Sequence, residues 1–143
     1  MSINPIAVGA TAPDITLPNT EGQPVSLSSL RGQPVAVVFF PFAFSGICTG
    51  ELCTLRDNIK DFQASGVKLV AISCDAMYAQ GAFAKAENYD FTLLSDFWPH
   101  GAAAKAFGVF NDEMGMAVRG TFLLDAEGKV RWEVVNDPGT ART

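Results

Sequence analysis

The amino-acid sequence predicts an α/β fold with a central mixed β-sheet flanked by helices, and three observations lead to this prediction. Two apolar, β-branched runs, at residues 35–40 and 67–72, have the pattern of buried strands, and a helical pattern lies between them. A strand, a helix and a strand in this order pair in parallel through a crossover. Two further apolar runs, at 121–124 and 130–134, flank a Glu-Gly turn and predict an antiparallel hairpin.

Length and composition predict a single domain over residues 1–143. The chain has 143 residues, of which 48% are hydrophobic and 17% charged, so it can bury a sizeable core. Its formal net charge of -5 disfavours nucleic acid and acidic lipid as partners. The longest apolar run, at 35–44, is too short to span a membrane, and the start of the chain has no secretory pattern. We therefore expect a cytoplasmic protein.

The remaining elements follow from local patterns along the chain. Residues 5–34 carry four prolines between short apolar pieces, which predicts an N-terminal β-hairpin. Helical spacing of apolar residues predicts a helix over 47–64, ended by Gly66. Beyond the second strand we expect a helix at 79–88, a short strand at 91–94 and a short helix at 102–107. This order of elements resembles the thioredoxin architecture.

Cysteine chemistry is the main functional question raised by the sequence. Three cysteines in a chain of this size fit a reducing compartment rather than a disulfide scaffold. Cys48 stands in the first turn of the predicted helix, directly after the central strand, where free N–H groups and the helix dipole stabilise a thiolate. Its position alone fits a buried, unreactive cysteine equally well.

Two neighbours of Cys48 extend the pattern. Taken singly, Pro41 ends a strand and Ser45 caps a helix. Together the three residues form the motif Pro-x-x-x-(Thr/Ser)-x-x-Cys, and with it the chain resembles a peroxiredoxin. The resemblance covers nearly the whole chain and includes Gly9–Asp14, Leu93–Asp96, Gly108–Phe110 and Arg119–Phe122. Within the family, residues 42–48 and 95–101 are most similar to the alkyl hydroperoxide reductase E group of actinobacteria.

The resemblance implies a thiol-dependent peroxidase that reduces hydrogen peroxide, organic hydroperoxides or peroxynitrite. Cys48 becomes a sulfenic acid in this interpretation, Pro41 shields it, and Ser45 binds the peroxide. Arg119 favours the thiolate and Glu51 holds the arginine. The alternatives are a surface arginine and an acid favoured by the helix N-terminus. Most family members carry Thr in place of Ser45, so we expect slower peroxide reduction.

The residue that reduces the sulfenic acid stays open. Cys53 lies at the offset of the resolving cysteine in one branch of the family. On an intact helix, however, the two Cα atoms are about 8.6 Å apart, beyond the roughly 7 Å limit for a disulfide, so the first turn must unwind. A buried cysteine on the helix face is the alternative for Cys53. Cys74 either reaches the pocket or packs beneath the loop. If neither resolves, the reductant is a thioredoxin- or glutaredoxin-like protein or a low-molecular-weight thiol.

No cofactor and no metal site are expected. His100 is the only histidine and no C-x2-C pair exists, which disfavours structural zinc, and no nucleotide fingerprint is present. The segment 98–100 is interpreted as a loop that packs near the site or at a subunit contact, with aromatic side chains that can also belong to the core. The resemblance further implies a homodimer. The family also closes with a further helix after the last strand, whereas only residues 136–143 remain here, so we expect that helix to be missing.

Two other functions are alternatives to a peroxidase, the first with the same fold and the second from another class. A disulfide oxidoreductase is disfavoured because the chain has no C-x-x-C motif. A redox-sensing or chaperone-like binding protein would signal through oxidation of Cys48. Catalytic turnover separates this rival from a peroxidase, since a sensor is oxidised once and a peroxidase cycles.

Overall fold

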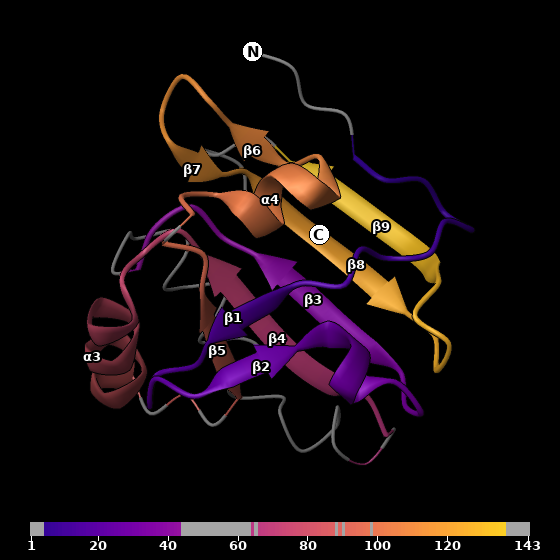
Figure 1. The fold of residues 1–143 in the computed structure, drawn as a ribbon, viewed down its shortest axis with the longest axis horizontal. Helices are drawn as coiled ribbons and strands as arrows, with labels where there is room; N and C mark the ends of the chain where they lie inside the picture. The colour runs from indigo at the N-terminus through magenta and orange to yellow at the C-terminus, as the bar shows by residue number, and fades with distance from the viewer. Residues whose placement is uncertain are drawn as a thin grey trace.

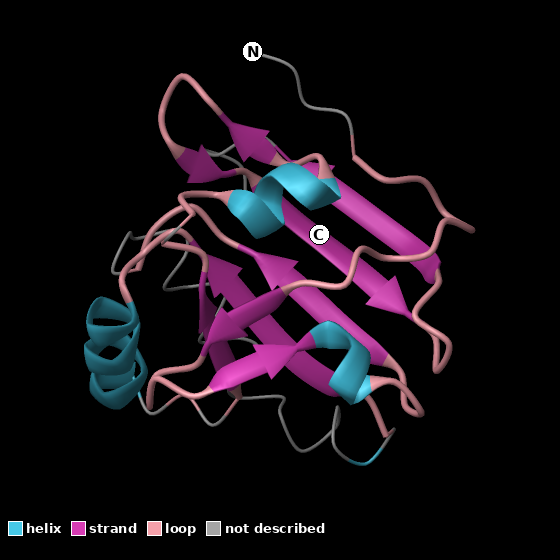
Figure 2. Ribbon diagram, in the orientation of Figure 1, coloured by secondary structure: helices cyan, strands magenta, loops and turns pink. Residues whose placement is uncertain are grey.

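The computed structural model describes residues 5–43, 64, 66–87, 89, 91–97 and 99–136. Their central feature is a five-stranded sheet with the strand order β5-β4-β3-β8-β9 (Figures 1 and 2). Its strands are β3 (Val35–Phe39), β4 (Lys68–Ser73), β5 (Thr92–Ser95), β8 (Arg119–Leu124) and β9 (Val130–Asn136). β3, β4 and β5 pair in parallel, whereas β8 is antiparallel to both β3 and β9. The sheet is therefore mixed, which confirms the predicted architecture.

An antiparallel hairpin precedes the sheet, as the proline-rich N-terminal sequence predicted. It consists of β1 (Thr16–Pro18) and β2 (Pro24–Ser26), followed by the 3-10 helix η1 (Leu27–Leu30). The side chain of Asn19 closes the turn by accepting the N–H groups of Glu21 and Gln23 at 2.9 and 3.0 Å. The hairpin crosses in front of β3 and β4 in Figure 1. Its Leu17, together with Leu27 of η1, belongs to the core beneath it.

The two described helices lie close to their predicted positions. α4 (Ala102–Phe107) coincides with the predicted helix at 102–107. Gly108 ends it in the left-handed conformation, with φ +77, and donates its N–H to the carbonyls of Ala104 and Lys105. α3 (Met77–Glu87) begins two residues before the predicted start, because the Gln80 N–H already bonds the carbonyl of Ala76. The helix predicted over 47–64 lies outside the described residues, Ala64 excepted.

A second small hairpin was missed in the sequence. β6 (Phe110–Asn111) pairs with β7 (Met116–Ala117) ahead of β8. Two-residue strands are too short to show an alternating pattern. The turn is closed by the side chain of Asn111, whose Oδ1 accepts the N–H groups of Glu113 and Met114, both at 3.1 Å.

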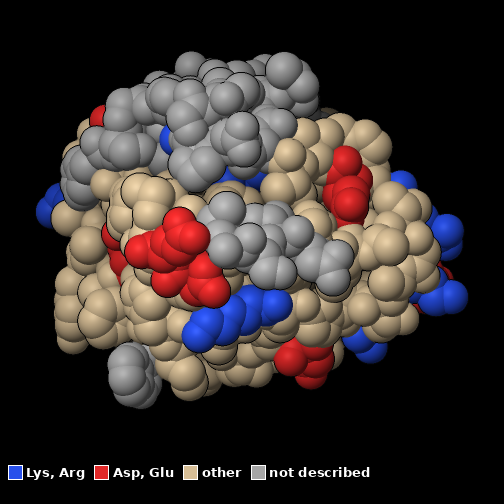
Figure 3. Space-filling model, turned by 90° about the horizontal axis from the view of Figure 1, so that it is seen from above, with Lys and Arg blue, Asp and Glu red and all other residues tan. Residues whose placement is uncertain are grey.

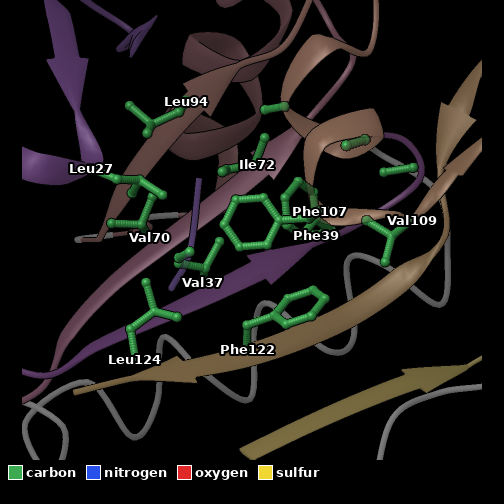
Figure 4. Packing of buried hydrophobic residues seen from close by; sticks show 14 of the residues in the cluster. Leu27, Val37, Phe39, Val70, Ile72, Leu94, Phe107, Val109, Phe122 and Leu124 are labelled. Carbon is green, nitrogen blue, oxygen red and sulfur yellow. The ribbon is translucent and has the colours of Figure 1, made fainter. Parts of the chain in front are cut away.

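The core forms one apolar layer on each face of the sheet. Along β3, Val35, Val37 and Phe39 face one layer, and the alternate residues face the other. The first layer is completed by α4, whose Phe107 packs against Phe39 and Phe122 (Figure 4). The second layer includes α3 and the aromatic side chains Phe83, Tyr89 and Phe91. Burial on both faces explains why β3 shows no polar alternation.

The surface seen in Figure 3 carries both signs of charge, with acidic and basic side chains interspersed over the face viewed from above. Such mixing matches a chain with a modest net charge of -5. In the described part of the chain, no helix combines the length and the apolar character needed to cross a membrane.

Candidate active site

Pro41 marks the point where the central strand leaves the sheet. The Phe40 N–H makes the last bond to β4, donating to the carbonyl of Ile72 at 3.0 Å. Pro41 has no N–H to continue this ladder, so the chain turns away from the sheet here. Pro41 itself is buried, whereas Phe42 is exposed. The motif that contains Cys48 thus begins at the carboxyl end of β3, the end where α/β sheets place their ligand sites.

Arg119 lies at the same edge of the sheet. It is the first residue of β8, and the pairing of Phe39 with Gly120 puts it beside the end of β3. Only 3% of its surface is exposed, so the alternative of a surface arginine is wrong. Buried arginines are rare unless their charge is paired. Two residues that lie far apart in the sequence, Pro41 and Arg119, are therefore brought to one edge by strand pairing.

A carboxylate at this edge was missed in the sequence. Asp75 follows β4 and accepts the backbone N–H of Ala43 on its Oδ2, at 2.7 Å. The Ser73 hydroxyl donates to the same oxygen, also at 2.7 Å. The signal was available, since Asp75 closely follows the predicted strand at 67–72, and parallel strands end at the same edge. Polar residues in that position are candidates for holding a neighbouring loop.

Cys74 stands beside Asp75 but has the environment of a core residue. It is 6% exposed and forms no disulfide within the described residues. Burial raises the pKa of the Cys74 thiol to about 12, and the nearby Asp96 carboxylate adds to this rise. A thiol reacts as its thiolate, so this environment suppresses the nucleophilicity of Cys74. The structure favours the packing interpretation of this residue.

His100 acts as a link between two loops. Its Nδ1 lies 3.2 Å from the carbonyl oxygen of Phe97, and its Nε2 lies 2.7 Å from that of Gly115. The ring also packs edge to face against Phe97 and Phe110. Both ring nitrogens of His100 thus face backbone carbonyls, as expected for a loop at 98–100 that packs against its neighbours. Trp98 lies outside the described residues. Within the described ranges, no three His, Cys, Asp or Glu side chains converge as metal ligands would.

The other predicted site residues are not among those described. Ser45, Cys48, Glu51 and Cys53 all fall between residues 44 and 63. Their roles stay predictions. The motif begins at the carboxyl end of β3, where Pro41 and Arg119 are both buried.

This fold defines a class of protein: an α/β protein of thioredoxin-like architecture, in which the motif that contains Cys48 begins at the carboxyl end of the central strand β3. Residues 8–133 match the AhpC/TSA family. The chain is 46% identical over 136 residues to alkyl hydroperoxide reductase E of Mycobacterium tuberculosis, covering 94% of this chain and 89% of that protein. It is 37% identical over 134 residues to peroxiredoxin Bcp of Escherichia coli, covering 90% and 85% of the two chains.

Structure comparison gives the same result. The crystal structure of peroxidoxin BcpB from Mycobacterium tuberculosis matches with a TM-score of 0.85 and 34% identity, covering 94% of this chain and 87% of that one. The chain belongs to the AhpC/TSA family of peroxiredoxins, and it is a thiol-dependent peroxidase. The expected family, its closeness to alkyl hydroperoxide reductase E and the thioredoxin-like fold are confirmed.

Proposed function

We propose that Cys48 is the peroxidatic cysteine of this enzyme and that Pro41, Ser45, Arg119 and Glu51 assist it. One observation carries the proposal: Pro41 and Arg119 are both buried at the edge of the sheet from which the Cys48 motif starts. A buried permanent positive charge beside a cysteine favours its thiolate. The family motif then assigns the nucleophile to Cys48.

The proposed reaction is a two-electron oxidation of sulfur. The Cys48 thiolate attacks one oxygen of the peroxide, so that an S–O bond forms while the O–O bond breaks. Sulfur loses two electrons and the peroxide gains them. The departing alkoxide or hydroxide takes up a proton and leaves as alcohol or water, and with peroxynitrite the leaving group is nitrite. Cys48 remains as a sulfenic acid.

The other residues act on charge and position. Arg119 stabilises the negative charge that develops along the breaking O–O bond, because its guanidinium is always protonated and offers several fanned donors. The Ser45 hydroxyl donates to the peroxide, and the Glu51 carboxylate orients Arg119. Pro41 keeps bulk water from the thiolate, which strengthens each of these interactions.

A second thiol regenerates the enzyme. It attacks the sulfenic sulfur, hydroxide leaves as water after protonation, and a disulfide forms. In this proposal that thiol is Cys53 or an external one, from a thioredoxin- or glutaredoxin-like protein or a low-molecular-weight thiol. With an external thiol, a further thiol attacks the mixed disulfide and releases Cys48. With Cys53, two external thiols reduce the Cys48–Cys53 disulfide in turn: the first forms a mixed disulfide and releases Cys48, and the second releases Cys53. The homodimer and the cytoplasmic location stay predictions.

The test is stopped-flow oxidation of the fully reduced protein by hydrogen peroxide and by an organic hydroperoxide. We expect Cys48→Ser to abolish rapid oxidation, because no other group is proposed to be an activated thiolate. Cys74→Ser is the matched control, since it removes a thiol that is buried and protonated, and it should keep the wild-type rate. Intact mass then identifies the product in the wild type and in Cys53→Ser.

Each mass outcome has one meaning. A gain of one oxygen that persists points to an external reductant, whereas a loss of two hydrogens that Cys53→Ser prevents points to resolution by Cys53. Slow oxidation of the wild type, or rapid oxidation that survives Cys48→Ser, contradicts the proposal. A single oxidation without turnover in the presence of a thiol reductant would instead indicate the redox-sensing alternative.

A further inference from the structure

We propose that Asp75 is a positioning residue for this peroxidase, because its carboxylate holds the chain at Ala43, at the start of the segment that leads to Cys48. The hydrogen bond from the Ala43 N–H to Asp75 Oδ2 is 2.7 Å long, which is short for an N–H donor. Ala43 lies two residues after Pro41 and two before Ser45 in the motif. This inference rests on the proposed function of Cys48.

The Asp75 carboxylate accepts hydrogen bonds from two donors, the Ser73 hydroxyl and the Ala43 N–H. The Ser73 Oγ has two contacts with N–H donors, Gln80 Nε2 at 2.9 Å and the backbone N–H of Asp75 at 3.4 Å. A hydroxyl has a single hydrogen, so it is left to donate to Asp75 Oδ2 at 2.7 Å. That oxygen therefore accepts from Ser73 and from Ala43 together. Two directed bonds determine where the acceptor sits and hence where the Ala43 N–H must be.

The support behind Asp75 is buried and lies on regular elements. Gln80, on α3, is fully buried and donates from the same Nε2 to the Leu94 carbonyl of β5 at 2.8 Å. A carbonyl can only accept, which determines the orientation of the amide. The Ser95 hydroxyl also donates to the backbone carbonyl of Asp75 at 2.6 Å. Asp75 is thus bonded directly to β4 and β5, and through Ser73 it is linked to α3. Groups held by packed elements are positioned more accurately than groups on free loops.

Loss of this acceptor frees Ala43. Rates of enzymatic steps fall steeply when reacting groups are misplaced, and an error of about 1 Å can cost roughly 100-fold. The inference therefore predicts that Asp75→Ala slows the oxidation of Cys48 by about 10- to 100-fold. Asp75→Asn keeps an oxygen that can accept both hydrogen bonds, so it should restore most of the rate without the negative charge.

Asp14→Ala is the matched control. Asp14 also accepts one backbone N–H across a loop, that of Ser28, at 3.0 Å. It directly follows Pro13, which lines a hollow together with Val35 at the start of β3, the opposite end of that strand from Pro41. Its loss should leave the oxidation rate unchanged. If Asp14→Ala slows oxidation as much as Asp75→Ala does, the effect of Asp75 is a general consequence of loosening the fold, and the inference fails.

Two readouts separate positioning from stability alone. The first is hydrogen exchange at the Ala43 amide, which does not depend on peroxidase activity: we expect protection to be lost in Asp75→Ala and kept in Asp75→Asn. The second is the pH profile of Cys48 alkylation in the folded protein, which we expect to move in Asp75→Ala and to stay in place in Asp14→Ala.

The outcomes also separate this inference from the proposed function. Unchanged Ala43 exchange, an unchanged oxidation rate in Asp75→Ala, or equal slowing in the Ala and Asn variants would each overturn the role of Asp75. Rapid oxidation that persists in Cys48→Ser would overturn the function of Cys48 instead, whatever the exchange at Ala43 shows.

Discussion

At the scale of single residues, the chemistry of Cys74 is decided by its surroundings rather than by its position. It follows β4, at the same end of the sheet as the start of the Cys48 motif. Burial nevertheless raises the pKa of its thiol to about 12, with contributions from the Asp96 and Asp75 carboxylates. Negative charges next to a buried thiol oppose its ionisation. A cysteine at this end of the sheet is therefore not by itself a reactive cysteine.

This environment predicts that Cys74 resists alkylation in the native protein. In a Cys48→Ser/Cys53→Ser double variant, Cys74 is the only thiol left. With a pKa of about 12 it is almost wholly protonated at pH 8, and the thiolate becomes available only as the pH rises toward 12 or the chain unfolds. We expect no mass gain with iodoacetamide at pH 8 and one adduct in urea. Equal labelling in both conditions would contradict the buried, protonated state.

At the scale of elements, α4 depends on a residue outside it. The helix has six residues and its N-cap, Gly101, offers no side chain. Asp96 caps it instead: Oδ1 accepts the Ala103 N–H and Oδ2 the Ala104 N–H, both at 2.9 Å. All three residues are buried. Without Asp96, the N–H groups of Ala103 and Ala104 would have no hydrogen-bond acceptor there, because water does not reach them. A helix this short is not stable alone and needs such support.

We therefore expect Asp96→Ala to lower the free energy of unfolding by about 2–6 kcal/mol, since it leaves two buried donors unpaired and each costs roughly 1–3 kcal/mol. Asp96→Asn should lose less, because its amide oxygen can still accept one of the bonds. Asp125 offers the matched control: it accepts the N–H groups of Glu127 and Lys129 in an exposed turn. Urea unfolding measures all three variants. A loss in Asp125→Ala as large as in Asp96→Ala would show that burial is not the cause.

At the scale of the whole molecule, three aromatic rings at the centre of the first core layer connect three elements of the fold. Phe39 lies 5.1 Å from Phe107 and 6.0 Å from Phe122, measured between ring centroids, and the latter two are 5.1 Å apart. These residues belong to β3, α4 and β8, so the cluster connects the central strand to the helix above it and to the antiparallel side of the sheet (Figure 4).

Truncation at the centre of this cluster should be among the most damaging changes. We expect Phe39→Ala to cost about 3–5 kcal/mol in unfolding free energy, because it removes buried area and leaves a cavity. Phe42→Ala removes the same atoms from a residue that is 43% exposed and should cost much less. Chemical denaturation compares the two, and similar losses would be evidence against the central place of Phe39.

Much of this molecule could be predicted from local patterns. The apolar run at 35–40, the spacing of residues 102–107 with Gly108 beyond them, and the turn between 124 and 130 led to elements found within one or two residues of their expected places. The hairpin β6–β7 could not be predicted, because two-residue strands have no periodicity. The position of Asp75 after a predicted strand marked it as a residue near the end of the sheet, but its partner could not be predicted, because that partner is the backbone N–H of Ala43 and every residue except proline has such a donor.

The sequence by itself determined the family, the fold class and the motif around Cys48, because short patterns of apolar residues, turn residues and a Pro-x-x-x-Ser-x-x-Cys spacing are local and survive in one dimension. Only the tertiary structure decided that Arg119 is buried beside the end of β3 and that burial keeps the Cys74 thiol protonated. The same holds for the hydrogen bond from the Ala43 N–H to the Asp75 carboxylate. Each of these depends on which strands are neighbours and on how much water the packed core excludes, and both follow from contacts between distant parts of the chain.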